Sequence, residues 1–197
     1  MTLDLSEIVA SLDRLANNQT MHPSRAWIAA TGKPELSIRD EMGSDIAAHH
    51  PNLVVAREWR RHDLAVLGLH GGCLAVIEGT ALYDFDLLRG PQSREYRQKL
   101  SKDSKKLRST KPVLPLLLIL MTSVRTEVPA ELNGVVKYSG YINSHLRKDG
   151  SELKSRGHAA VLKLIAEVGT LQHSVQLTSR EVMGLQLSLQ ALLVSIG

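Results

Sequence analysis

The stretch WRRHDLAVLGLHGGCLAVIEGTALYDFD, residues 59–86, decides the fold. It holds two apolar runs, residues 63–69 and 73–85, on either side of the pair Gly71-Gly72. Strand-like runs joined by two glycines are typical of a tight antiparallel hairpin. A third run of the same kind, residues 53–59, comes just before them. We therefore expect an antiparallel ribbon of three strands.

The last strand of this ribbon has two different faces, because alternate residues of a strand point to opposite sides. One face is mainly apolar and carries Ile77, Gly79, Ala81, Tyr83 and Phe85. The other face gathers carboxylates and carries Glu78, Thr80, Leu82, Asp84 and Asp86. We expect the first face to join the core and the second to gather the carboxylates.

Helices should surround the ribbon. Helical spacing of apolar residues predicts helices at residues 5–17, 37–49, 130–146 and 151–167, and a basic helix from Pro91 to about residue 108. The apolar run at residues 113–122 predicts a central strand, and the strand–helix–strand order favours a crossover to a parallel neighbour.

The C-terminal segment allows two interpretations. Alternating leucines favour strands at residues 172–178 and 185–196, whereas Thr178 and Glu181 have the spacing of a helix capping box. We favour the strands. The chain is then an α/β protein with a mixed sheet flanked by helices. Its 197 residues suit one domain, with a core at about 37–124 and additional helices and strands at 125–197.

Positive charge is concentrated in one segment. Residues 89–111 hold nine basic and two acidic residues, while the whole chain has a net charge of only +4. Such a segment suits either a phosphate backbone or a solvated helix face. The candidates for contacts to nucleic acid are Arg94, Arg97, Lys102, Lys105 and Lys106.

Other features bear on location. The longest apolar run, residues 113–121, is about half the length of a membrane-spanning helix, so we expect no membrane partner. The opening residues MTLDLSEIV lack the pattern of a secretory signal, which predicts a cytoplasmic protein. The single cysteine, Cys73, is expected in the core rather than as a nucleophile.

Three acids follow the ribbon in order: Glu58, Asp63 and Glu78. The hairpin folds the third strand back along the second, so Asp63 and Glu78 should lie side by side. Paired carboxylates can hold Mg²⁺ or Mn²⁺, and such a cation can polarise a phosphate and activate water. The histidines show no metal-binding pattern, and His62 is expected on the ribbon surface.

These residues resemble the signature of the PD-(D/E)XK nuclease superfamily: an aspartate, a spacer, then Asp or Glu, any residue and Lys. Here the signature is Asp63, the hairpin, and Glu78-Gly79-Thr80, and the resemblance covers about residues 37–124. It implies a restriction-endonuclease-like fold with Asp63 and Glu78 as metal ligands. It also implies the Gly79 carbonyl as a third ligand and Glu58 or Glu41 as an auxiliary acid.

Thr80 departs from that signature, which places a catalytic lysine there. A threonine hydroxyl carries no charge and reaches less far than an ammonium group. Cleavage by the usual arrangement is therefore in doubt. Lys99 or Lys102 on the following helix could supply the lysine from a neighbouring element.

The function expected first is a nuclease-fold protein that binds a divalent metal and DNA and is a weak or inactive endonuclease. Aromatic residues make up 4% of the chain, which favours duplex DNA over stacked single strands. The alternatives are a non-catalytic interaction module on a decayed nuclease fold, as a homodimer or within a larger complex, and a small-molecule metalloenzyme.

Overall fold

The computed structural model describes residues 3–110 and 112–197, so Lys111 of the basic segment and the first two residues lie outside it. A six-stranded mixed sheet runs through the molecule in the order β1-β2-β3-β4-β6-β5. The β3–β4 pair is parallel, and the other four pairs are antiparallel. The strands are β1 Leu53–Trp59, β2 His62–Gly68, β3 Cys73–Tyr83, β4 Leu114–Val124, β5 Thr170–Val182 and β6 Leu185–Ser195.

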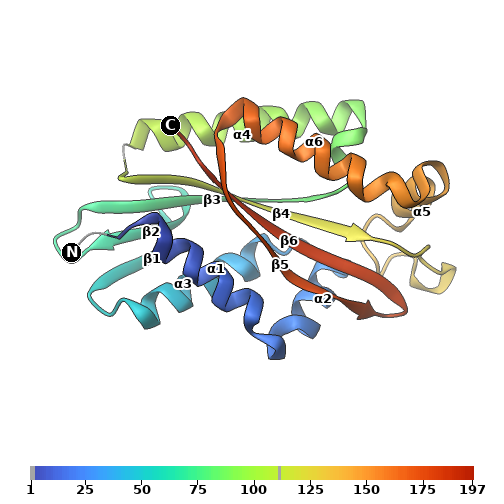
Figure 1. The fold of residues 1–197 in the computed structure, drawn as a ribbon, viewed down its shortest axis with the longest axis horizontal. Helices are drawn as coiled ribbons and strands as arrows, with labels where there is room; N and C mark the ends of the chain where they lie inside the picture. The colour runs from blue at the N-terminus through green and yellow to red at the C-terminus, as the bar shows by residue number, and fades with distance from the viewer. Residues whose placement is uncertain (1–2, 111) are drawn as a thin grey trace.

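Helices cover both faces of the sheet (Figure 1). One face packs against three helices, α1 Leu5–Asn17, α2 His22–Thr31 and α3 Glu35–His49. The opposite face packs against α4 Gly90–Thr110 and α6 Leu153–Val168, while α5 Ser139–Asp149 lies beyond the end of β4 (Figure 1). The mixed sheet flanked by helices is therefore as the sequence predicts.

The ribbon and the crossover are confirmed. The glycine pair closes the β2–β3 hairpin, with Gly71 at a φ of 80° that suits a residue without a β-carbon. The basic helix α4 connects β3 to its parallel neighbour β4, and its residues Leu100 and Leu107 are fully buried on the sheet. These two leucines fix which side of α4 faces solvent.

Other predicted elements were wrong or missed. The helix predicted at residues 130–146 is a short 3-10 turn, Ala130–Leu132, followed by a loop and then α5, because Gly134 has a φ of 84° that ends any helix there. The capping-box interpretation of the C-terminus is wrong, since β5 and β6 pair along a long hairpin that turns at Met183 and Gly184. Helix α2 was not predicted.

The carboxylate-bearing face of β3 is buried. It is covered by α4 and α6, and Val76 and Leu82 pack there with Leu100. The physical reason is the crossover, because a strand with a parallel neighbour is covered by the connecting helix. Glu78 is consequently only 5% exposed and stands within the interior rather than at a solvated edge.

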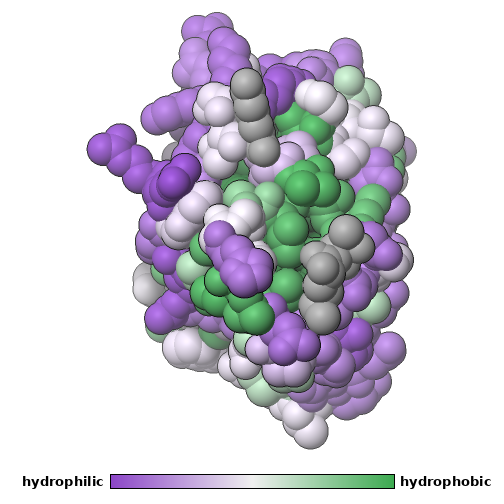
Figure 2. Space-filling model, turned by 90° about the vertical axis from the view of Figure 1, so that its left-hand side faces the viewer, coloured by the Kyte–Doolittle hydropathy of each residue, from purple (hydrophilic) through white to green (hydrophobic). Residues whose placement is uncertain are grey.

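The end of the molecule that carries the β2–β3 hairpin has an apolar surface. Figure 2 shows a hydrophobic area on this side, ringed by hydrophilic residues. Leu69 in the hairpin and Val113 before β4 are among the most exposed large apolar residues, at 65% and 67%.

Among the described residues, the helices are all too short or too polar to span a membrane.

Candidate functional site

A pocket of about 340 Å³ opens between α3, the β2–β3 ribbon and α4. It brings together the carboxylates of Glu35, Asp63 and Glu78 and the ammonium groups of Lys99 and Lys106. We call it the acid–lysine pocket. Two of its acids belong to the predicted signature, so the ribbon places Asp63 and Glu78 in one site.

Asp63 and Glu78 enter the pocket from different sides of β3. The pairing of β2 with β3 ends at Leu64 and Ile77, one residue before the two acids. The Asp63 carboxylate lies beside Gly79 and Glu35, on the α3 side of the strand, whereas Glu78 points toward α4, where it meets Lys106 and His62. The Gly79 amide donates a hydrogen bond of 2.7 Å to Asp63 Oδ2, which orients that carboxylate at the pocket wall.

Glu78 is buried and closely surrounded by positive charge and a histidine. Its Oε1 atom lies 2.7 Å from Lys106 Nζ and 2.5 Å from His62 Nδ1. Burial raises the pKa of Glu78 above its ordinary value, the hydrogen bonds from Lys106 and His62 lower it, and the nearby Asp63 charge raises it further. A buried carboxylate needs such partners, so Lys106 and His62 stabilise the charged form.

Lys99 reaches the pocket from α4 and lies beside Thr80. Its Nζ donates to the Thr80 hydroxyl and, at 3.1 Å, to the Gly79 carbonyl. Asp103, one helical turn further on, holds the same ammonium at 3.0 Å. The positive charge that the family signature would place on the side chain of residue 80 is here brought next to residue 80 by a neighbouring helix.

Other predicted residues lie elsewhere. Glu58 is 66% exposed and pairs with Arg39 at 2.7 Å. Glu41 pairs at 2.5 Å with the buried Arg25, away from the pocket. Lys102 is exposed on α4. The structure therefore brings together Asp63, Glu78, Gly79 and Lys99, and does not bring Glu58, Glu41 or Lys102 to them.

Two residues of the site were missed from the sequence. Glu35 lines the pocket, because α3 begins two residues before the predicted start of the helix. His62 is 1% exposed, so the expectation of a surface histidine was wrong. It lies buried because β2 begins at His62 and α4 covers that end, where His62 Nε2 is 2.7 Å from Thr110 Oγ1. In the sequence, the position of His62 directly before Asp63 was the signal that could have indicated its place in the site.

The donors of the pocket do not fit a divalent cation as they stand. Four carboxylates and a carbonyl have the hard oxygens that Mg²⁺ prefers, and Glu35 Oε2 is buried without a hydrogen-bond partner among the residues that the structure describes. Lys106, however, forms an ion pair with Glu78, and Lys99 donates a hydrogen bond to the Gly79 carbonyl, so these oxygens already have partners. Within residues 3–110 and 112–197, no three His, Cys, Asp or Glu side chains converge as a metal site.

The predicted basic residues divide between two roles. Arg94, Lys102 and Lys105 are exposed on the outer side of α4. Arg97 is ion-paired with Glu167 of α6, and Lys106 turns inward to Glu78. The outer face of α4 therefore keeps three of the five predicted cations on a surface next to the pocket.

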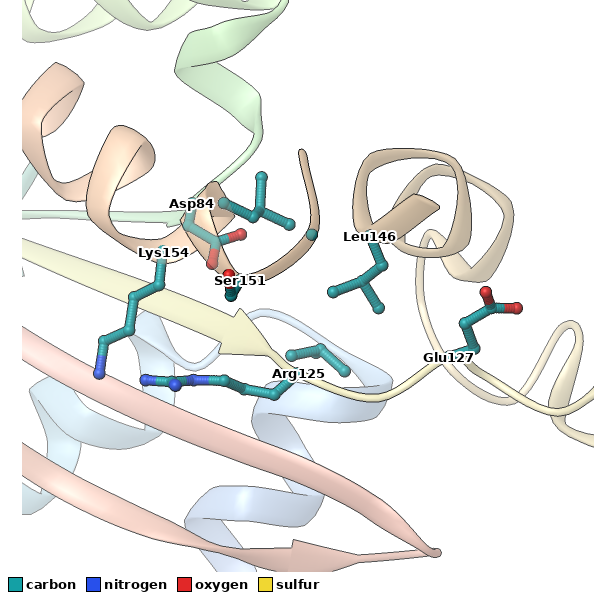
Figure 3. Close-up of a pocket in the computed structure, with 9 residues that line it drawn as sticks. Asp84, Arg125, Glu127, Leu146, Ser151 and Lys154 are labelled. Atoms are coloured by element: carbon teal, nitrogen blue, oxygen red, sulfur yellow. The ribbon is translucent and has the colours of Figure 1, made fainter. Parts of the chain in front are cut away.

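A second pocket, of about 390 Å³, lies where β3 and β4 end (Figure 3). The cationic ends of Arg125 and Lys154 point toward one another there, and Asp84 faces into the same space (Figure 3). Burial raises the pKa of Asp84 to about 6. Burial also lowers the pKa of Lys154, and the charge of Arg125 lowers it further.

A comparison of the chain with protein-family models, curated proteins and solved structures finds no match.

Proposed function

We propose that this chain binds the phosphate backbone of a nucleic acid in the acid–lysine pocket and along the outer face of α4. We further propose that its fold is of the PD-(D/E)XK type, with cleavage activity that is weak or absent. The observation that carries the proposal is Lys99, whose ammonium lies beside Thr80 and among the signature acids.

The order of elements supports the fold assignment. The family resemblance implies a helix, a three-stranded antiparallel ribbon, a crossover helix and a parallel strand. The chain has α3, β1–β2–β3, α4 and β4 in that order, with β3 and β4 parallel. Asp63 on β2 and Glu78 on β3 both line the acid–lysine pocket, which agrees with what the resemblance implies for the two acids of its signature.

The charges of the pocket support an anionic ligand. Five cationic side chains line it against four carboxylates. Three of the carboxylates are held internally: Glu78 by Lys106 and His62, Asp103 by Lys99, and Asp63 by a backbone amide. The Lys99 side chain is 47% exposed. Its three N–H groups bond Thr80, Gly79 and Asp103, and a phosphate oxygen that arrives from outside would replace the bond to Asp103. Lysine binds phosphate as a compact point charge.

Weak or absent cleavage follows from the same interactions. Lys106 and Lys99 already bond the Glu78 and Gly79 oxygens that a divalent cation would need, and Thr80 carries no charge. We expect plasmid DNA to stay largely uncut when Mg²⁺ or Mn²⁺ is added to the purified protein.

Exposed lysines on α4 should control the salt dependence of binding. Every lysine that pairs with a phosphate of duplex DNA adds about 0.9 to the slope of log affinity against log salt. We expect Lys102→Gln combined with Lys105→Gln to flatten that slope by about 1 to 2. Fluorescence anisotropy with a labelled duplex from 50 to 300 mM salt, about the range where such ion pairs weaken, measures it.

Arg180→Gln is the matched control, since Arg180 is exposed on the edge strand β5 and its removal also costs one positive charge. We expect it to leave the slope nearly unchanged. A slope that the double variant and Arg180→Gln change equally would point to general charge rather than a site on α4. No binding at low salt would favour the protein-interaction module.

A further inference from the structure

Another pocket, of about 490 Å³, adjoins the acid–lysine pocket and shares three of its residues, Lys33, Tyr96 and Lys99. We call it the tyrosine pocket, because Tyr96, Tyr138 and Tyr141 line it. Its size falls within the range of pockets that hold small organic ligands. Lys99 stands between the two pockets and belongs to both.

Most of the aromatic residues of the chain gather at this pocket. The chain has four tyrosines and one phenylalanine. The fourth tyrosine, Tyr83, supports Tyr138 from behind by an edge contact with ring centroids 5.5 Å apart, and Phe85 stacks on Tyr83 at 5.2 Å. A low aromatic content, which seemed to disfavour base stacking, is thus concentrated in one place.

The two outer rings are partly exposed, and each has a cation over it: Arg89 over Tyr141 and Lys137 over Tyr138. Tyr138 is 41% exposed and Tyr141 is 48% exposed, whereas Tyr83 is buried. The guanidinium of Arg89, itself a planar group, lies 3.8 Å from the centre of the Tyr141 ring. Exposed aromatic faces next to arginine are typical of sites where nucleobases stack.

The pocket also has an unsatisfied polar group. Gln92 lines it, and the side-chain Oε1 of Gln92 is buried without a hydrogen-bond partner among the described residues. A buried amide that lacks a partner costs stability, so such groups usually have one. The edge of a nucleobase offers the donors and acceptors that an amide can pair with.

We propose that the tyrosine pocket takes one unpaired nucleobase from a strand whose phosphate is bound at Lys99. The inference rests on the proposed function and adds a base site to it: a single strand, or a duplex end with an unpaired base, would use both pockets, whereas an intact duplex would contact the phosphate site alone. Because Lys99 borders both pockets, one nucleotide can place its phosphate in the first and its base in the second.

The test compares a short single-stranded DNA carrying 2-aminopurine with a blunt duplex of the same length. Stacking on tyrosine quenches this fluorescent base. We expect Tyr141→Ala to weaken single-strand binding by between about 5-fold and 100-fold, with loss of quenching and a less than twofold effect on the duplex. Tyr141→Phe keeps the ring and should keep both properties. Trp27→Ala, at an exposed aromatic of α2, should change neither.

Two results would overturn the inference: no quenching by the wild type, or equal weakening of single strand and duplex by Tyr141→Ala. Lys99→Gln separates this question from the proposed function. If Lys99→Gln changes neither affinity while quenching still depends on Tyr141, the phosphate site is wrong and the base pocket stands.

Discussion

Replacing Arg25 by methionine is expected to lower the free energy of unfolding by about 3 to 5 kcal/mol, as for other buried ion pairs that lose one partner. Arg25 is 1% exposed, and its guanidinium bonds Glu41 at 2.5 Å and 3.0 Å and the Leu15 carbonyl at 2.7 Å. Methionine fills much of the volume but leaves the Leu15 carbonyl without its Arg25 donor and Glu41 with only the Ser37 hydroxyl as a donor. Urea denaturation measures the change.

Arg147→Met is the control, because Arg147 forms an ion pair with Glu127 in which both side chains are more than half exposed. Solvent screens such a pair, and we expect no measurable change.

The Arg25→Met variant also tests whether Glu41 is the auxiliary acid that the family resemblance implies. If Arg25→Met left stability intact but altered nucleic-acid affinity, Glu41 and Arg25 would belong to the binding site rather than to the core.

Asp84 is expected to make the protein less stable as pH rises. Burial raises the pKa of Asp84 from 3.8 to about 6, so the native state holds the proton more tightly than the unfolded chain. Its favourable contribution is complete below about pH 4 and is lost as pH rises through about 6, a change of about 3 kcal/mol.

Asp84→Asn removes this titration while keeping the size of the side chain. The unfolding free energy of wild type minus that of Asp84→Asn, followed from pH 4 to pH 7, should fall by up to about 3 kcal/mol. Taking the difference between the two proteins cancels the contributions of other carboxylates. Parallel curves for the two proteins would show that Asp84 is ionised in the native state throughout, and would contradict the effect of its burial.

Much of the fold follows from local signals in the sequence. The Gly71-Gly72 turn, the two-residue alternation of the strands and the leucines of α4 are each readable within a few residues. The helix predicted at residues 130–146 failed because Gly134 interrupts an otherwise suitable run. The burial of the carboxylate-bearing face of β3 could not be predicted locally, because the helices that cover it, α4 and α6, come from segments far along the chain.

The candidate site was readable only in part, for a similar reason. Asp63 and Glu78 are brought to one pocket by one hairpin, which the sequence spacing describes. Glu35 and His62 enter through the packing of α3 and α4 onto the ribbon. Glu41 has the same chemistry as Glu35 on the same helix, and the side of α3 that each occupies decides which lines the pocket. The gathering of all four tyrosines likewise depends on α4 and the start of α5.

The central claim is that lysines of the acid–lysine pocket bind a nucleic-acid phosphate without a divalent cation. Its most direct test is the affinity of wild type, Lys99→Gln and the α6 surface control Lys163→Gln for single-stranded DNA, measured in EDTA and again in Mg²⁺. We predict binding in EDTA that Mg²⁺ does not strengthen, a loss of about tenfold in Lys99→Gln, as for removal of a charge-assisted hydrogen bond, and little change in Lys163→Gln. Binding that requires Mg²⁺, or that Lys99→Gln leaves unchanged, would contradict the claim.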